Sequence, residues 1–296
     1  MRDGLDSFWQ DVKGELAAVP MDAYVEAVEP GLTPLINTWR VTLTGLDGVR
    51  FRAYLSIPNL GPDDDPLPAA LYTPGYGGDT SHSAMLGLCY EGRMALLTVY
   101  PRGQGESTQY WQLPEGVTKL TLGLDDPSRQ YYRGGYADCL RGIDFLCSRP
   151  EIDASRIGVV GLSQGGGLTL ATAALDDRVR VAVAHEPFLC NYPVAVETAT
   201  TGPYLELIEH FRRDPAGREQ ALNTLGTFDP LNLAPMIDCP IFLTIGLADT
   251  TCPPETIRPV YERIEALKGL VEIPGAGHGW FHIYREIDRM WLGRFL

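Results

Sequence analysis

From residue 69 onward, short apolar segments of β type alternate with segments of helical periodicity. Such alternation needs right-handed crossover connections, and it predicts a mainly parallel sheet with helices on both faces. Strands of such a sheet are buried on both sides, which agrees with their nearly continuous apolar character. The predicted strands are 69–73, 94–100, 156–161, 179–184, 240–246 and 270–273. The predicted helices are 81–90, 133–149, 164–175, 254–267 and 280–292.

The chain before residue 69 has a different pattern. Apolar side chains of residues 5–18 share one helical face, which predicts an amphipathic helix that Pro20 ends. Residues 38–45 and 49–57 alternate apolar and polar side chains, with the turn 46–48 between them. This pattern predicts an N-terminal antiparallel hairpin.

Two segments interrupt the strand–helix alternation. Residues 101–130 are rich in Gly, Gln and Pro, which predicts a long functional loop. Residues 186–238 are too long for one crossover and contain helical patterns near 203–213 and 216–225. We expect this segment to form a helical, cap-like insertion. Without an internal repeat or a low-complexity linker, residues 1–296 are predicted to form one domain.

The composition limits the partners. The chain has 296 residues, 45% of them hydrophobic, and a formal net charge of −14. Nucleic acid and anionic membranes would be repelled by such a surface, so neither is an expected partner. Six scattered cysteines without a Cys-x-x-Cys pair predict reduced core thiols.

The first residues of the chain bear on its location, and an acidic segment at 63–65 bears on metal binding. The first six residues lack the pattern of a signal peptide, and no run of about 18 apolar residues occurs. A cytoplasmic protein is therefore expected. Asp63, Asp64 and Asp65 predict a solvated turn rather than a metal site, because no histidine or spaced carboxylate accompanies them.

A candidate nucleophile follows the predicted strand 156–161. Residues 161–165 read Gly-Leu-Ser-Gln-Gly, a Gly-x-Ser-x-Gly pattern between a strand and a helix. Ser163 would stand on a sharp turn whose neighbours must be small, and the helix start would offer free N–H groups to an oxyanion. A glycine-rich helix start that binds a phosphate is the alternative. No acidic residue ends a strand about 20 residues later, which disfavours a dinucleotide fold.

A base and an orienting acid are expected downstream of the serine, in the chain order of α/β-hydrolases. His278 follows the last predicted strand among small residues, whereas His282 lies one helical turn further on. Asp249 follows the strand 240–246 and would hold the tautomer of His278. His185 with Glu186 is a rival pair, but His185 precedes the expected position of the base.

Two further assignments complete the candidate site. The oxyanion donors are predicted to be the backbone N–H groups of Gln164 and Tyr76, the latter in the loop after the strand 69–73. The spacing of His278 and His282 could also suit a metal, but it lacks the internal Glu of a zinc protease. We therefore expect neither a metal nor a cofactor.

The chain resembles the acetyl xylan esterase / cephalosporin C deacetylase family of α/β-hydrolases. Arg102-Gly103-Gln104 matches the family's Arg-Gly-Gln motif, and residues 161–166 match its Gly-x-Ser-Gln-Gly-Gly elbow. Further similar segments extend over nearly the whole chain: 7–9, 131–134, 144–146, 148–150, 187–190, 246–249 and 252–254.

The resemblance implies a role for each matched residue. Ser163, Asp249 and His278 would form the catalytic triad. Arg102 and Gln104 would brace the loops around the nucleophile, while Tyr76, Pro187 and Phe188 would contact the substrate and line a small acyl pocket. The resemblance also implies a hexameric ring whose interior cavity admits short oligosaccharides.

The chain departs from the family at two places. Gly279 stands where the family has a glutamate directly after the histidine, and His185-Glu186 stand where it often has a smaller or acidic residue. These differences concern local hydrogen bonding, assembly and substrate more than the chemistry.

The sequence thus predicts a serine carboxylesterase that removes small acyl groups, above all acetyl, from sugars or similar alcohols. The substrate would be a small acetylated ester or oligosaccharide. A peptidase or a longer-chain esterase is one rival, distinguished by acyl-chain preference. A non-catalytic protein on the same fold is the other, distinguished by failure of Ser163 to react with a fluorophosphonate.

Overall fold

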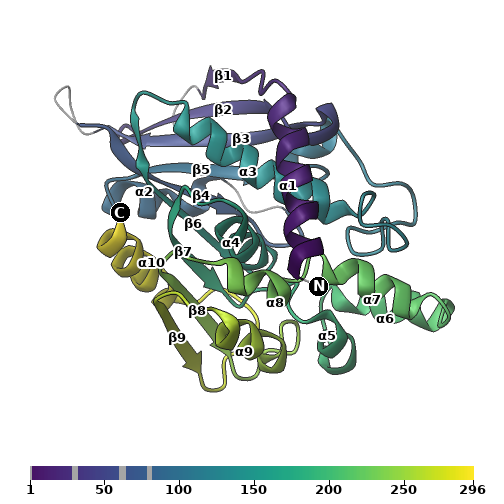
Figure 1. The fold of residues 1–296 in the computed structure, drawn as a ribbon. Helices are drawn as coiled ribbons and strands as arrows, with labels where there is room; N and C mark the ends of the chain where they lie inside the picture. Colours follow the sequence, from purple (N-terminus) through teal and green to yellow (C-terminus); the bar gives the residue numbers. More distant parts are fainter. Residues whose placement is uncertain (1, 29–32, 60–64, 79–81) are drawn as a thin grey trace.

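A nine-stranded sheet forms the centre of the computed structural model, which describes residues 2–28, 33–59, 65–78 and 82–296 (Figure 1). The strand order is β1-β2-β3-β5-β4-β6-β7-β8-β9. The strands are β1 (Tyr24–Ala27), β2 (Ile36–Thr44), β3 (Arg50–Pro58), β4 (Leu67–Thr73), β5 (Ala95–Tyr100), β6 (Ile152–Leu162), β7 (Val179–His185), β8 (Ile241–Gly246) and β9 (Lys268–Ile273).

The two ends of the sheet differ in strand direction. β1, β2 and β3 pair antiparallel, and β3 pairs antiparallel with β5. The pairs from β5 through β4, β6, β7 and β8 to β9 are all parallel. The predicted hairpin and the mainly parallel sheet are both confirmed. The carboxyl ends of the parallel strands meet at one edge, where ligand sites of such sheets lie.

Helices cover both faces of the sheet (Figure 1). They are α1 (Arg2–Ala18), α2 (Leu86–Glu91), α3 (Tyr131–Cys147), α4 (Gln164–Leu175), α5 (Tyr192–Thr198), α6 (Tyr204–Arg213), α7 (Arg218–Gly226), α8 (Pro230–Leu233), α9 (Pro254–Arg263) and α10 (His282–Phe295). Short 3₁₀ turns occupy Leu46–Gly48, His82–Met85, Gly105–Gln109 and Ala234–Met236.

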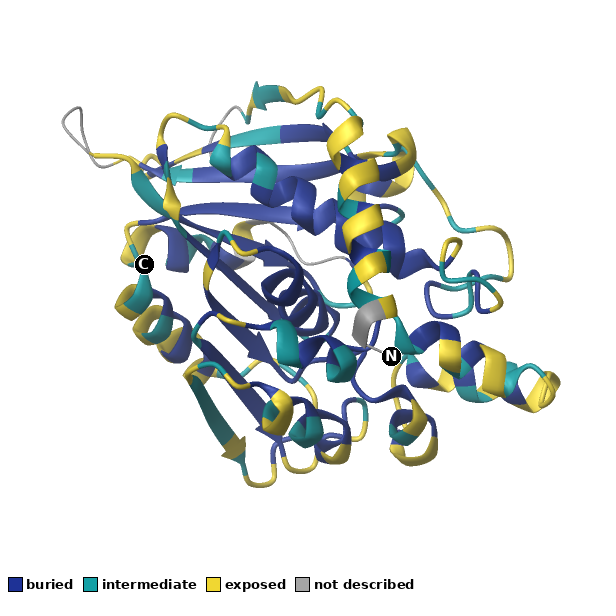
Figure 2. Cartoon of the chain, in the orientation of Figure 1, coloured by how far each residue is buried: buried dark blue, intermediate teal, exposed yellow. Residues whose placement is uncertain are grey.

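Alternate side chains of the strands feed two separate cores. Val159 and Ala182 belong to a large core that includes residues of α1, α3, α4 and α9. Val160 and Val181, their neighbours along the same strands, belong to a smaller core under α2 and α10. The period of two along a strand produces this division. The central strands are buried over most of their length (Figure 2).

The segment between β7 and β8 contains the helices α5, α6, α7 and α8. The predicted helical pieces 203–213 and 216–225 agree closely with α6 and α7. The outer surfaces of α6 and α7 are exposed, while Tyr204 and Leu207 of α6 are fully buried (Figure 2). The sequence did not predict the short helices α5 and α8.

Several predicted boundaries were wrong. The predicted helix 254–267 ends at Arg263, because the chain must turn before β9 begins at Lys268. Only the second half of the predicted helix 81–90 is α-helical, after a 3₁₀ turn. β1 was missed because its four half-buried or exposed residues carry no strong alternation.

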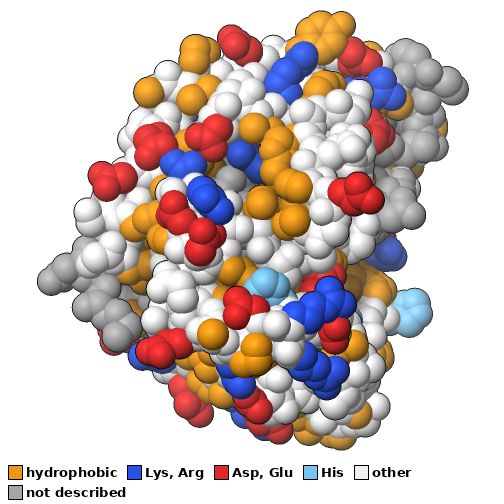
Figure 3. Space-filling model, turned by 90° about the vertical axis from the view of Figure 1, so that its right-hand side faces the viewer, with side chains coloured by type: hydrophobic (Ala, Val, Ile, Leu, Met, Phe, Trp, Pro, Cys, Tyr) orange, Lys and Arg blue, Asp and Glu red, His pale blue; other side chains and the backbone are white. Residues whose placement is uncertain are grey.

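The remaining expectations from the sequence concern membrane helices, cysteines and charged side chains. No helix among the described residues is long and apolar enough to cross a bilayer. All six cysteines are free, and five of them are buried. Acidic and basic side chains intermingle on the face shown in Figure 3. Asp63 and Asp64 of the predicted acidic turn lie outside the described residues.

Candidate active site

Ser163 lies on the sharp turn between β6 and α4, as the Gly-x-Ser-x-Gly pattern predicted. Its backbone has φ 61° and ψ −121°, a conformation that non-glycine residues rarely adopt. Such a residue costs on the order of 1–3 kcal/mol and persists only where its surroundings hold it. Here the Ser163 N–H donates to the carbonyl of His185 at 2.9 Å, and the Ser163 carbonyl accepts from Phe188 at 2.9 Å.

The glycines on either side of the serine are needed for close backbone approach. A Cβ on Gly161 would collide with the backbone of Gly165. A Cβ on Gly165 would collide with the carbonyl of Thr73 at the end of β4. The motif therefore packs the start of α4 against two adjacent strands, which leaves the serine side chain at the carboxyl edge of the sheet.

The structure brings Ser163, His278 and Asp249 into one hydrogen-bonded row. His278 Nε2 lies 2.8 Å from Ser163 Oγ, and His278 Nδ1 lies 2.7 Å from Asp249 Oδ2. Asp249 stands in the loop after β8, and His278 in the loop between β9 and α10. This geometry is that of a nucleophile, a base and an acid that orients the base.

The electrostatics of His278 suit a base that becomes cationic. Burial alone lowers the pKa of His278, but the hydrogen bond and the charge of Asp249, with the charge of Glu186, raise it above the ordinary value. The side chain of His278 is 23% exposed, whereas that of Asp249 is fully buried. The imidazolium is thus stabilised by a carboxylate that solvent does not screen.

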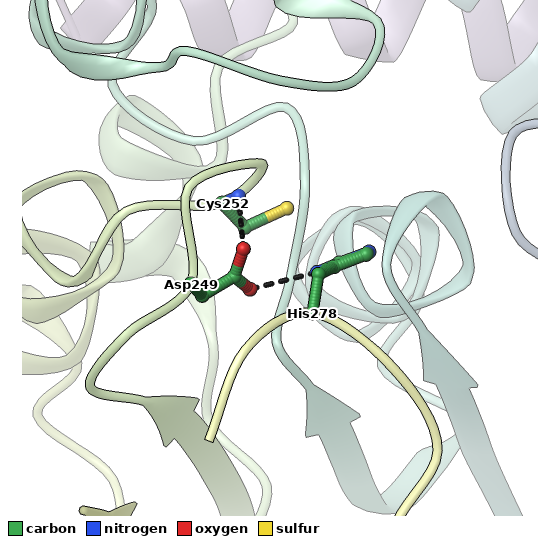
Figure 4. A group of neighbouring side chains, drawn as sticks. All are labelled: Asp249, Cys252 and His278. Atoms are coloured by element: carbon green, nitrogen blue, oxygen red, sulfur yellow. Dashed lines mark hydrogen bonds and ion pairs between the residues drawn. The ribbon is translucent and has the colours of Figure 1, made fainter. Parts of the chain in front are cut away.

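The donor atoms of Asp249, Cys252 and His278 lie within 4.8 Å of one another and are the one metal-sized group among the residues that the structure describes (Figure 4). Asp249 Oδ1 already accepts from the N–H groups of Thr251 at 2.8 Å and Cys252 at 2.9 Å. Burial raises the pKa of the Cys252 thiol well above its ordinary value, whereas a metal needs the thiolate. We therefore assign Asp249 and His278 to the row with Ser163 rather than to a metal site.

The backbone segments that carry the predicted oxyanion donors lie beside the serine. Gln164 is the first residue of α4, so its N–H belongs to those without a partner inside the helix. The loop that carries Tyr76 lies against the nucleophile, because a Cβ on Gly75 would stand 3.9 Å from the Cβ of Ser163. Both backbone segments are therefore near the place where an ester carbonyl would be attacked.

A buried amide network fixes these two segments relative to each other. Gln104 donates through Nε2 to the carbonyl of Gly75 at 2.6 Å. Its Oε1 accepts from Gln164 Nε2 at 2.7 Å and lies 3.3 Å from Lys119 Nζ. Gln104 thus joins Gln164 of the elbow directly to the loop of Gly75 and Tyr76, which we call the oxyanion loop.

Lys119 is a buried residue of the candidate site that the sequence did not single out. Its Nζ donates to the carbonyl of Tyr76 at 2.6 Å and stands 4.4 Å from the centre of the Tyr76 ring. Burial lowers the pKa of Lys119 to about 8, against the charge of Glu206, which raises it. The one sequence feature that could have pointed to Lys119 is that it is the single lysine of the predicted functional loop 101–130.

Tyr76 also contacts the insertion. Its hydroxyl donates to Glu206 Oε2 of α6 at 2.6 Å, and burial together with this bond raises the pKa of Tyr76 well above its ordinary value. The rings of Tyr76 and Phe188 meet edge to face at 5.9 Å. Phe188 is fully buried and packs 4.2 Å from the ring of Tyr204. Pro187 is buried beside it, against the first turn of α4.

Arg102 was expected to brace the loops around the nucleophile, and the contacts of its side chain are with α3 and the hairpin turn. Its guanidinium makes a two-point contact with buried Asp138 of α3, with Nε at 3.0 Å and Nη2 at 2.8 Å. Nη2 also donates to the carbonyl of Leu46 at 3.0 Å. Arg102 therefore ties the start of the 101–130 loop to α3 and to the hairpin turn, and only Gln104 reaches the elbow.

The imidazoles of His185 and His282, the two histidines weighed beside His278, have other surroundings than the Ser163 hydroxyl. His185 is buried, with Nε2 at 2.9 Å from Asp288 Oδ1 and Nδ1 at 3.1 Å from Thr244 Oγ1. His282 is exposed at the start of α10. Glu186, in contrast, lies beside His278, with Oε2 3.4 Å from Nδ1.

Comparison with known proteins decides the family. A family model described as acetyl xylan esterase matches residues 1–294. The chain belongs to the acetyl xylan esterase family. The predicted resemblance is thereby confirmed, and the enzymes of this family are carboxylic ester hydrolases.

Individual members show how close the likeness is. The structure of an acetyl xylan esterase from Paenibacillus sp. R4 matches with a TM-score of 0.92 and 35% identity, over 99% of this chain and 94% of that one. Acetyl xylan esterase 1 from Thermoanaerobacterium sp. JW/SL YS485 matches with a TM-score of 0.88 and 27% identity, over 98% and 93%. The predicted α/β-hydrolase fold is confirmed by these two esterase structures.

A curated relative is longer than this chain. The acetyl esterase Axe7A of Xylanibacter ruminicola is 28% identical over 296 residues, which cover 97% of this chain and 66% of the relative. The chain therefore spans just under two thirds of that protein.

Proposed function

We propose that this chain is a serine carboxylesterase that removes acetyl groups by way of an acyl-enzyme. The observation that carries the proposal is the row of hydrogen bonds from Asp249 through His278 to Ser163, with distances of 2.7 and 2.8 Å. A serine becomes nucleophilic when a positioned base takes its proton, and this row supplies that base. Membership of the acetyl xylan esterase family supports the choice of an acetyl ester.

Acylation begins when Ser163 Oγ attacks the ester carbonyl while His278 Nε2 takes the hydroxyl proton. The carbonyl oxygen becomes an oxyanion, which the N–H groups of Tyr76 and Gln164 stabilise. When the tetrahedral intermediate collapses, the C–O bond to the alcohol breaks and His278 gives its proton to the leaving oxygen. The product is acetyl-Ser163.

Deacylation repeats these steps with water. His278 takes a proton from the water as its oxygen attacks the acetyl carbonyl. Collapse of the second intermediate returns the proton from His278 to Ser163 Oγ and releases acetate. Asp249 holds the Nδ1–H of His278 throughout, and the steps use no metal or organic cofactor.

The packing beside the serine supports the proposed small acyl pocket. The carbonyl of Ser163 accepts from the N–H of Phe188, so the chain at Pro187 runs directly past the nucleophile. The rings of Phe188 and Tyr76 meet edge to face there. Phe188 packs closely against Tyr204 of the insertion. Its ring therefore has little freedom to move aside for a longer acyl chain.

The proposed substrates are small acetylated sugars such as xylo-oligosaccharides, or similar esters such as cephalosporin C. Two relatives bear the name acetyl xylan esterase, which supports the sugar ester. We further propose a hexameric ring in a reducing compartment such as the cytoplasm. The free cysteines support the compartment, and light scattering that gave a monomer mass would overturn the ring.

The test is hydrolysis of p-nitrophenyl esters from acetate to octanoate by the wild type and Ser163→Ala. We expect fast turnover of acetate that falls with chain length. Loss of the nucleophile should lower kcat on the order of 10⁶-fold. Ser155→Ala is the matched control, since Ser155 is an exposed residue whose hydroxyl contacts Asp153.

Each outcome has a definite reading. Full activity in Ser163→Ala would overturn the mechanism. A preference for octanoate would retain the serine hydrolase and overturn the acetyl assignment. If the wild type hydrolyses no ester and a fluorophosphonate leaves Ser163 unlabelled, the protein is non-catalytic.

A further inference from the structure

Glu186 is a buried carboxylate beside the candidate base that the Ser163–His278–Asp249 scheme does not use. It follows directly after β7, and its side chain has no exposed surface. Its Oε2 lies 3.4 Å from His278 Nδ1, the nitrogen that Asp249 Oδ2 contacts at 2.7 Å. Two carboxylates therefore face one side of the imidazole ring.

Two donors hold the Glu186 carboxylate in this place. The N–H of Gly279 donates to Oε2 at 2.9 Å, and the hydroxyl of Tyr284 donates to Oε1 at 2.6 Å. Gly279 is the residue directly after His278, so its hydrogen bond to Glu186 holds the loop that carries the base. A carboxyl group that accepts two such bonds is best matched in its ionised form, which only accepts.

The backbone of Glu186 is strained to reach this position. Its φ is 41°, in the left-handed region, and its N–H donates to the carbonyl of Thr244 in β8 at 3.0 Å. Room for the side chain depends on Gly246, since a Cβ there would stand 3.0 Å from Glu186 Oε1. Strain that the surroundings maintain is typical of functional sites.

A second layer fixes the donor of Glu186. The ring of Tyr284 stacks on His185 with 4.2 Å between ring centroids and an angle of 11° between ring planes. The imidazole of His185 is itself held by Asp288 and Thr244. The Tyr284 hydroxyl thus has a defined position, and Glu186 has little freedom to leave His278.

We propose that Glu186 is a positioning residue that supplies a second negative charge to His278 and holds its loop. It would stabilise the imidazolium formed when His278 takes a proton and would keep Nδ1 directed at the carboxylates. The inference rests on the proposed role of His278 as the base.

Among the residues that the structure describes, the titratable groups against His278 come from three places in the fold. Asp249 and Cys252 come from the loop after β8, Ser163 from the elbow and Glu186 from the end of β7. Tyr284 of α10 faces Glu186 itself. Burial raises the pKa of Glu186 above its ordinary value, and the charge of Asp249 adds to this rise. The bonds from Tyr284 and Gly279 and the charge of His278 offset only part of it.

The decisive variant is Glu186→Gln, which keeps the shape and removes the charge. The amide oxygen can still accept from Gly279, and the Tyr284 hydroxyl can accept from the amide nitrogen. We expect the pKa of His278 to fall by about one unit, because a facing carboxylate within about 4–6 Å has that effect or more. In the profile of kcat/KM against pH, the acid limb should move to lower pH by the same amount. The plateau value of kcat/KM should fall about tenfold.

An NMR titration of His278 measures the same shift without any substrate. Its signal is assigned with His278→Gln, and Asp176→Asn is the matched control, since that buried carboxylate pairs with Arg178 at the C-terminal end of α4. An unchanged His278 pKa in Glu186→Gln overturns the inference even if the esterase proposal holds. A lowered pKa supports the inference even if no ester is hydrolysed.

Tyr284→Phe keeps the charge of Glu186 and removes one of its hydrogen-bond donors. This variant tests the same inference if Glu186→Gln does not fold. The less stabilised carboxylate should attract the imidazolium proton more strongly, so the pKa of His278 should rise. Movement of the His278 pKa in opposite directions in the two variants supports the inference. A fall or no change in Tyr284→Phe contradicts it.

Discussion

The two sides of the candidate active site have opposite electrostatic character. The base side, at the carboxyl ends of β7, β8 and β9, places the carboxylates of Asp249 and Glu186 around His278. The oxyanion side, formed by the loops after β4 and β5, contains amides and the buried cation of Lys119. In the proposed ester cleavage a positive charge would develop on the first side and a negative charge on the second. The fixed charges and dipoles of each side match the charge that the proposal places there.

The two sides also differ in how they are held. Asp249 is fixed by backbone N–H groups of its own loop, two and three residues further on. The oxyanion side is fixed by side chains far apart in sequence, because Gln104 joins Gly75 to Gln164 and Lys119 contacts Tyr76. Removal of a single side chain should therefore loosen the oxyanion side without abolishing it.

After loss of the nucleophile, the largest effect is expected on the base side, in Asp249→Asn. Backbone donors hold the Oδ1 position, so the amide nitrogen would replace Oδ2 and face His278 Nδ1. That places the imidazole proton on Nε2, where it cannot accept from Ser163. We expect kcat to fall by up to about 10⁴-fold.

The residual rate of Asp249→Asn sharpens the comparison. Glu186 remains 3.4 Å from Nδ1 and can still accept its proton. The double variant Asp249→Asn with Glu186→Gln should therefore be slower than the product of the single effects predicts. Steady-state kinetics on p-nitrophenyl acetate measure kcat of the two single variants and of the double variant. If the effects on the activation free energy simply add, the two carboxylates act independently.

An intermediate effect is expected on the oxyanion side, in Lys119→Met. The Tyr76 peptide would lose the donor that fixes its carbonyl, so kcat/KM should fall by about 10- to 100-fold, less than for removal of an oxyanion donor itself. The wild type should also lose activity above about pH 8, as Lys119 gives up its proton. This alkaline limb should disappear in Lys119→Met. Its persistence there would assign the limb to another group.

The smallest effect is expected where the oxyanion side meets the insertion, in Tyr76→Phe. The backbone N–H and the ring that faces Phe188 remain, while the hydrogen bond to Glu206 is lost. We expect a change of a few-fold in KM with kcat nearly unchanged, and a loss of about 1 kcal/mol in the free energy of unfolding. Thermal unfolding and kinetics on acetate check both. A large fall in kcat would show that α6 controls the oxyanion loop.

Motif spacing and chain order were sufficient to nominate the base side. Ser163, Asp249 and His278 each follow a strongly apolar strand, and parallel strands end at the same edge of a sheet. The structure accordingly finds them in contact. Gln104 was nominated only through the family resemblance, and its two-sided contact could not be derived from spacing.

Lys119 and Glu186 show what the sequence leaves open. Lys119 lies in an irregular loop, where no periodicity predicts which way a side chain faces. Glu186 was weighed only as the partner of His185, its neighbour in sequence. Its position was decided by a strained backbone turn and by contacts with Gly279 and Tyr284, more than 90 residues away.

By itself, the sequence determined the α/β class, the parallel sheet and the residues at the ends of its strands, because these follow from periodicity and local chain geometry. Only the tertiary structure decided which buried charges surround each reacting group. Those contacts join segments far apart in the chain. A buried lysine or glutamate is stable only where packing supplies its partners, which no local pattern encodes.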